Sequence, residues 1–83
     1  MNKKLYSVYD RTGEIFEPPF VESTDGMAVR MIQSLVANNP QHPIARFGED
    51  FILYKIGEYN PENGMITAVK HQPIMELKEV GEQ

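Results

Sequence analysis

The segment from Gly48 to Met65, GEDFILYKIGEYNPENGM, limits the fold more than any other part of the chain, because it joins the densest apolar run to the clearest turn signal. Its aromatic and β-branched residues predict a strand over about 51–59, and a second strand follows over about 65–71. Between them, Pro61 suits the first central position of a type I turn, and Gly64 suits a following left-handed residue. The segment therefore predicts a β-hairpin.

One helix is predicted over Ser23–Asn39. Ser23, Thr24 and Asp25 can each cap its start, since their side-chain oxygens accept hydrogen bonds from the free N–H groups of the first turn. The sequence Asn38-Asn39-Pro40 ends it, because proline cannot continue a helix. Apolar residues at helical spacing predict one buried stripe: Ala28, Met31, Ile32, Leu35 and Val36. In a domain with one helix, such a stripe most simply covers a sheet.

Two further segments precede the helix. Lys4–Tyr9 has the composition of a strand, and the turn signal Asp-Arg-Thr-Gly follows it. Glu14–Glu22 contains Pro18-Pro19, which is excluded from a central strand because proline has no N–H to donate. We expect an extended crossing there, with Phe16 and Phe20 anchored on the core.

The remaining segments are shorter. Gln41–Asp50 predicts a loop with one helical turn at Ile44–Phe47. Gln72-Pro73 is expected to end the last strand. In Ile74–Val80, apolar residues spaced by three slightly favour a helical turn over a strand. We expect an acidic tail of about residues 74–83 to be mobile.

Together these elements predict one domain over residues 1–83 with an α+β fold. The order is β-α-β-β, and the simplest architecture is a small antiparallel or mixed sheet with a β-hairpin and one helix packed on one face. A chain of 83 residues has a thin core, and association of copies is a common way to add burial at this size.

Side-chain alternation gives the strand 51–59 two different faces. We expect Lys55 and Gly57 to mark the face away from the helix, because they interrupt its apolar character. The face expected toward the helix then carries Ile52, Tyr54 and Ile56. The opposite face carries Phe51, Leu53 and Tyr59.

A monomer with this arrangement would expose an apolar patch, which soluble monomers rarely do. Three explanations remain open. The Phe16–Val21 segment or the tail covers the patch, a second copy covers it in a symmetric dimer, or the patch is an aromatic platform for single-stranded bases with Lys55 supplying charge.

Composition excludes several classes of protein. Eight Lys and Arg residues against twelve Asp and Glu residues give a net charge of −4, which disfavours binding to duplex DNA by phosphate neutralisation. The absence of cysteine excludes disulfides and thiolate metal sites. No apolar run approaches the ~18 residues of a membrane span, and none follows Lys3-Lys4 as in a signal peptide. We therefore expect a cytoplasmic protein without membrane contact.

No catalytic motif is recognisable. The chain has no Gly-rich phosphate loop, no HExxH and no GxSxG. Its two histidines, His42 and His71, lie in a loop and near a strand end, without carboxylates at the spacing of a metal site. We expect no enzymatic activity, no metal and no cofactor.

Four motifs in order resemble a phage family. They are a YSVYD start within LYSVYDRTGEIFEPPF, a PF segment, a helix opening at STDGMAVRMI, and the strand LYKIGEY followed by an acidic turn. Over nearly its whole length the chain resembles the small non-structural protein of the gokushoviruses, single-stranded-DNA phages of the Microviridae. The resemblance implies a DNA-binding protein of the host bacterial cytoplasm that aids the switch from double-stranded replication to single-stranded genome synthesis and packaging. It implies no catalytic residues.

The leading hypothesis is a homodimeric, non-enzymatic accessory protein of phage genome replication or packaging that contacts single-stranded DNA or replication proteins. The candidate DNA-contacting cations are Arg11, Arg30, Arg46, Lys55 and Lys70. Tyr59 is a candidate stacking group, and Tyr54 becomes one if the strand faces are reversed. The candidate dimer patch is Phe51, Leu53 and Tyr59. The alternative is a protein-interaction module that binds a viral or host protein without nucleic-acid contact.

Overall fold

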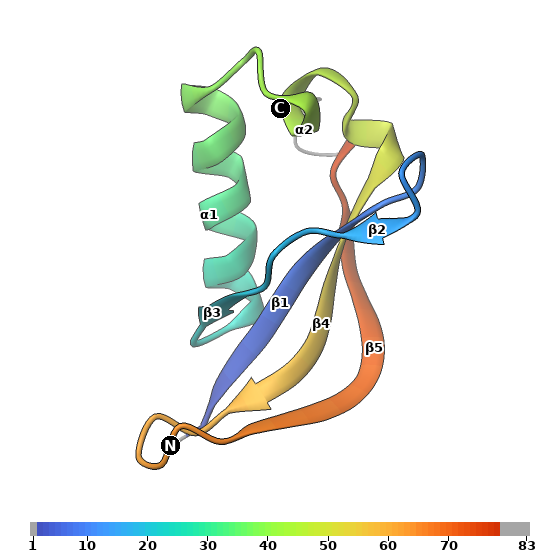
Figure 1. The fold of residues 1–83 in the computed structure, drawn as a ribbon. Helices are drawn as coiled ribbons and strands as arrows, with labels where there is room; N and C mark the ends of the chain where they lie inside the picture. Colours follow the sequence, from blue (N-terminus) through green and yellow to red (C-terminus); the bar gives the residue numbers. More distant parts are fainter. Residues whose placement is uncertain (1, 79–83) are drawn as a thin grey trace.

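The computed structural model describes residues 2–78, in which a five-stranded antiparallel sheet carries a long helix against one face (Figure 1). In chain order the elements are β1 (Lys3–Asp10), β2 (Ile15–Phe16), β3 (Phe20–Glu22), α1 (Asp25–Asn38), α2 (Pro43–Arg46), the 3-10 helix η1 (Gly48–Asp50), β4 (Phe51–Tyr59) and β5 (Ile66–Glu76). The sheet order is β2-β1-β4-β5, and β3 also pairs with β1. The predicted α+β class, with one helix on one face, is confirmed.

The helix α1 begins and ends close to the predicted positions. Thr24 is the cap, and its Oγ1 accepts a hydrogen bond from the Met27 N–H at 3.1 Å. The hydroxyl of Tyr6 in β1 donates to Asp25 Oδ1 at 2.5 Å, which ties the first turn of α1 to the sheet. Burial, and then this bond to a carboxylate, raise the pKa of Tyr6 well above its usual range.

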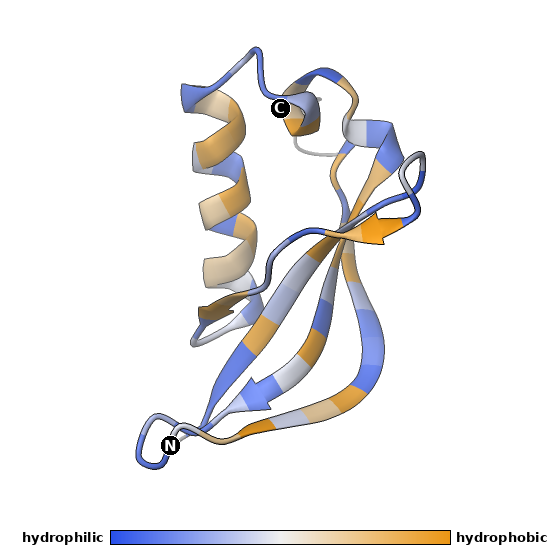
Figure 2. Ribbon diagram, in the orientation of Figure 1, coloured by the Kyte–Doolittle hydropathy of each residue, from blue (hydrophilic) through white to orange (hydrophobic). Residues whose placement is uncertain are grey.

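The core lies between α1 and the sheet. Hydrophobic and polar residues alternate along the strands, and hydrophobic residues recur along α1 (Figure 2). Val8 of β1, Leu53 of β4 and Met75 of β5 are direct neighbours across the sheet and lie on the same side. The buried apolar residues are Tyr6, Val8, Ala28, Ile32, Ile44, Phe51, Leu53 and Leu77.

The predicted assignment of the β4 faces is wrong. Phe51 and Leu53 are 5% and 0% exposed and belong to the core beneath α1, whereas Ile52 and Tyr54 lie on the opposite face. Lys55 shares the α1 side and is half-buried. The aliphatic stem of a lysine can pack on apolar surface while its ammonium group reaches water. The charge of Lys55 was therefore a poor guide to which face of β4 lies against the helix.

The hairpin between β4 and β5 forms as predicted. Gly64 adopts a left-handed φ of 75°, and its N–H donates to the Asn60 carbonyl at 2.7 Å. Ile56, also expected to face the helix, has no direct partner, because the pairing of β4 shifts register between Lys55 and Gly57. The turn end of this hairpin projects beyond α1 (Figure 1).

The strand β5 is longer than predicted. It continues through Pro73 to Glu76, and Leu77 beyond it is buried. Proline is tolerated there because β5 is an edge strand. The expected strand end at Gln72-Pro73 is therefore wrong, and so is the helical turn for residues 74–76. The expected mobility of the tail stays a prediction, and its residues beyond Lys78 lie outside the described residues.

The extended crossing around Pro18-Pro19 is confirmed, and one of its two anchors is where we expected it. The crossing lies between β2 and β3, which pair with the same edge of β1. Phe20 stacks on Tyr6 in the core with ring centroids 5.7 Å apart. Phe16 lies on the other face of the sheet and is 38% exposed.

The loop before β4 carries α2, close to the helical turn predicted at Ile44–Phe47. The His42 side chain caps it, since Nδ1 accepts a hydrogen bond from the Ile44 N–H at 3.1 Å. Ile44 is buried in the core and holds α2 against the sheet.

Candidate nucleic-acid interface

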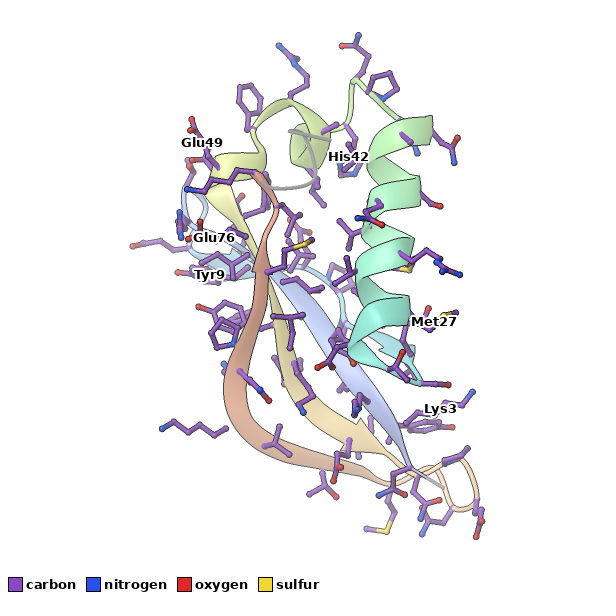
Figure 3. The ribbon with its side chains drawn as sticks, turned by 180° about the vertical axis from the view of Figure 1, so that it is seen from behind. Lys3, Tyr9, Met27, His42, Glu49 and Glu76 are labelled. Carbon is purple, nitrogen blue, oxygen red and sulfur yellow. The ribbon has the colours of Figure 1, made fainter. Side chains whose placement is uncertain are left out.

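Four aromatic rings gather on the face of the sheet that α1 does not cover. We call Tyr9, Phe16, Tyr54 and His71 the aromatic cluster. Strand pairing creates it: Tyr9 is opposite Phe16, and Tyr54 is opposite Ser7, two residues before Tyr9. Directly paired residues of antiparallel strands point to the same face. Figure 3 shows Tyr9 on the side of the sheet away from α1.

The rings of the cluster contact one another mainly at their edges. Tyr9 and Phe16 have centroids 4.8 Å apart, and Phe16 lies 5.8 Å from Tyr54 and 5.2 Å from His71. The last two pairs have the edge-to-face geometry that aromatic pairs favour. Phe16 and His71 are exposed, and the two tyrosines are half-buried.

A rigid floor supports the cluster. Ser7 lies fully buried between the strands, and its hydroxyl donates to the Glu17 carbonyl at 2.6 Å. The Glu17 N–H in turn donates to the Val8 carbonyl at 2.8 Å. These bonds hold the β2 segment against β1 and so fix the position of Phe16.

Sequence reasoning identified one member of this cluster. Tyr54 was a candidate stacking group on the condition that the strand faces are reversed, and they are. Tyr59 lies near the hairpin end, paired with Lys3 and Ile66, outside the ring contacts of the cluster. The alternation of Lys4–Tyr9 places Tyr9 on one face with Ser7, but nothing local indicated that Phe16 would join it.

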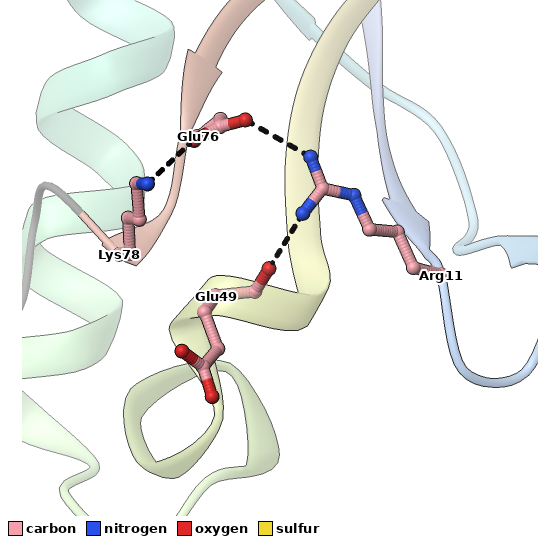
Figure 4. A network of polar contacts seen from close by, with 4 residues as sticks. All are labelled: Arg11, Glu49, Glu76 and Lys78. Carbon is pink, nitrogen blue, oxygen red and sulfur yellow. Dashed lines mark hydrogen bonds and ion pairs between the residues drawn. The ribbon is translucent and has the colours of Figure 1, made fainter.

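Arg11, a predicted DNA contact, is engaged within the protein (Figure 4). Its two terminal nitrogens donate to the Glu49 carbonyl and to Glu76 Oε1, each at 2.9 Å. Lys78 Nζ lies 3.3 Å from the other carboxylate oxygen of Glu76. The hydrogen bonds from Arg11 and then from Lys78 hold the pKa of Glu76 below its usual range. This network joins the end of β1 to η1 and β5.

The other predicted cations are not gathered around the aromatic cluster. Arg30 is exposed on α1, and Lys55 lies on the α1 side of the sheet. The Arg46 guanidinium lies over the Phe47 ring, 5.1 Å from its centroid. Lys70 is exposed and directly precedes His71 in β5.

The predicted dimer patch does not exist as a surface. Phe51 and Leu53 are core residues, so neither is available to a partner, and Tyr59 is half-buried. The larger exposed apolar side chains lie elsewhere: Ile15, Phe16, Val21, Met27, Phe47, Met65 and Ile66.

No group of three or more potential metal ligands occurs among residues 2–78. Within the same residues, no helix is long and apolar enough to cross a membrane. The feature that the structure does assemble is an aromatic face on a sheet.

The fold and this face define a small α+β protein whose antiparallel sheet is covered by a helix on one side and lined with aromatic rings on the other. The sequence pattern of the Phage ORF5 protein family matches residues 3–80, and the chain belongs to that family. It is therefore a phage protein. No curated protein and no solved structure matches the chain.

Proposed function

We propose that the protein is a non-enzymatic phage accessory protein that binds single-stranded DNA through its aromatic cluster during genome replication or packaging. In the host bacterial cytoplasm it would aid the switch from double-stranded replication to single-stranded genome synthesis. The gathering of four rings on the uncovered sheet face carries the proposal. Aromatic side chains on an antiparallel sheet are a common platform for unpaired bases.

Stacking rather than charge supplies the affinity in this proposal. Each stacked base contributes about 1–3 kcal/mol, and every base has a face that can stack. The net charge of −4 opposes the DNA backbone, and Arg11 is already paired. We therefore expect modest affinity with a shallow salt dependence, of about one or two contacts at a slope of ~0.7 each. Lys70, which is exposed and precedes His71 in β5, is the candidate cation for such a contact.

Fluorescence anisotropy with labelled oligothymidine tests the proposal. Tyr54→Ala should weaken binding roughly 5- to 150-fold, which corresponds to one lost stacking contact. Tyr59→Ala is the matched control, because Tyr59 is also half-buried in β4 but lies outside the aromatic cluster. Circular dichroism checks that both variants fold. Equal weakening by both variants, or no binding by the wild type at low salt, contradicts the proposal.

The alternative function is a module that binds a viral or host protein without contacting nucleic acid. The same uncovered aromatic face supports it, because aromatic residues are enriched in protein interfaces. Co-purification from infected cells separates the two functions. A nuclease-resistant protein partner, together with no oligonucleotide binding, favours the alternative.

We propose further that two copies associate through the projecting end of the β4–β5 hairpin. Met65 and Ile66 are exposed there, beyond the reach of α1. Light scattering of the wild type should give twice the single-chain mass at high concentration, since assembly follows mass action. Ile66→Glu should restore the single-chain mass, and Ile15→Glu, at another exposed isoleucine, should not. If concentrated wild-type protein gives only the single-chain mass, the proposed dimer is contradicted.

A further inference from the structure

A groove lies on the α1 side of the sheet, opposite to the aromatic cluster. Two neighbouring hollows of about 380 and 320 Å³ form it, and both are lined by Asp10, Pro43 and Phe51. We call this the α2 groove. Leu35 and Ile44 extend its apolar floor in the first hollow. These volumes are at the lower end of the ~300–1,000 Å³ range of ligand pockets, so each hollow has room for a side chain of a partner.

Exposed apolar side chains continue the α2 groove at its outer end. Phe47 lines the second hollow and is 49% exposed. Ile15, paired directly with Asp10 across β1 and β2, is exposed beside it. A well-folded chain gains nothing from leaving these side chains in water, and clustered exposure of this kind marks interaction surfaces.

The polar lining of the α2 groove is acidic. Asp10 and Glu17 line the first hollow, and Asp50 with Asp10 lines the second. His42 is the other ionisable group, and its Nδ1 is engaged in capping α2. No described Lys or Arg residue lines either hollow.

We infer that the α2 groove binds a basic, apolar-anchored peptide segment of another protein. The apolar floor takes one or two leucine-sized or aromatic side chains, and the acidic rim pairs with flanking arginines or lysines. Charge complementarity of this kind selects partners and accelerates encounter. Nucleic acid is disfavoured, because three carboxylates would face its phosphates.

This site is independent of the proposed DNA contact, since the two lie on opposite faces of the sheet. The neighbouring residues Phe16 and Glu17 belong to different sites. Phe16 joins the aromatic cluster, whereas Glu17 lines the α2 groove with Leu35. A variant of one face therefore leaves the other intact, and the two proposals fail separately.

The test measures anisotropy of a labelled peptide with two central leucines flanked on each side by three arginines. The variant Asp10→Asn with Glu17→Gln removes two rim charges and keeps the shapes. Asparagine at position 10 retains the oxygen that accepts the Thr12 N–H at 2.9 Å. Since an exposed charge pair changes an equilibrium by a factor of about 1.4 to 5, the loss of two such pairs should weaken binding roughly 2- to 25-fold.

The matched control is Glu58→Gln with Glu62→Gln, which removes the same charge from the hairpin and should change binding less than about twofold, since these carboxylates lie outside the groove. Phe47→Ala should weaken the leucine-containing peptide and leave an all-arginine peptide unchanged. Tyr54→Ala should not alter peptide binding. The inference is overturned if the control weakens binding as much as the groove variant, if the all-arginine peptide binds as tightly as the leucine-containing one, or if the peptide does not bind at low salt.

Discussion

The hydrogen bond from Tyr6 to Asp25 makes a prediction about stability and pH. Tyr6→Phe keeps the buried ring and its stacking on Phe20 but removes the hydroxyl that donates to Asp25 Oδ1 at 2.5 Å. A hydrogen bond to a charged group is worth about 1.5–3 kcal/mol. Asp25 is only half-buried, so water can replace part of the lost bond, and we expect a loss of about 1–2 kcal/mol in the free energy of unfolding.

Thermal unfolding followed by circular dichroism measures this loss. For a domain of this size, 1 kcal/mol corresponds to about 4–8 °C in Tm, so the variant should melt roughly 4–16 °C lower at pH 7. Tyr59→Phe is the control, because no described hydrogen bond joins its hydroxyl to a carboxylate.

The pH dependence separates this hydrogen bond from a general packing effect. The pKa of Tyr6 is raised in the folded protein, so above about pH 10 the unfolded chain loses a proton that the folded protein keeps. The unfolded state is then favoured, and stability falls as the pH rises further, with full stability below that range. Tyr6→Phe should flatten this alkaline decline. A variant that melts with the wild type and declines equally above pH 10 refutes the reasoning.

Three further predictions follow from the fold. Leu53→Ala should lower the free energy of unfolding by about 2–5 kcal/mol in denaturant titrations, because it leaves a cavity beneath α1; a loss below 1 kcal/mol would contradict the face assignment. Glu76→Gln should flatten the acid limb of the stability profile, because the lowered pKa of Glu76 gives stability that is present above its unfolded value and lost as the pH falls; an unchanged acid limb would show that the Arg11 contact adds nothing. Gly57→Ala should destabilise the hairpin and lower Tm, because the new Cβ would lie 2.8 Å from the Thr67 carbonyl oxygen; an unchanged Tm would show that the strands separate freely there.

Local signals predicted the elements well because their causes are local. Thr24 caps α1 with its own side chain, and Gly64 supplies the left-handed turn residue. The end of β5 was not predictable in this way. Proline normally ends a strand, yet Pro73 continues one because, among residues 2–78, no strand pairs with the outer edge of β5. Edge position is a property of the whole sheet and has no local signal.

The candidate site was less predictable than the elements. Tyr54 and Tyr9 are visible in their strands as aromatic residues on alternating positions. Phe16 and His71 join them through contacts between residues far apart in the chain, and the sequence placed His71 only near a strand end. Arg11 was a plausible phosphate contact by charge alone. Its pairing with Glu76 depends on the ends of β1 and β5 lying close together, which only the fold decides.

By itself, the sequence determined a capped helix, a hairpin, an α+β class and two chemically distinct faces on β4. Only the tertiary structure decided which of those faces is inside. Alternation separates Leu53 from Tyr54 but assigns neither to the core, since both faces contain apolar residues. Burial of Leu53 beneath α1 depends on how the strands and the helix pack together, and the same packing leaves Tyr54 on the uncovered face with Phe16.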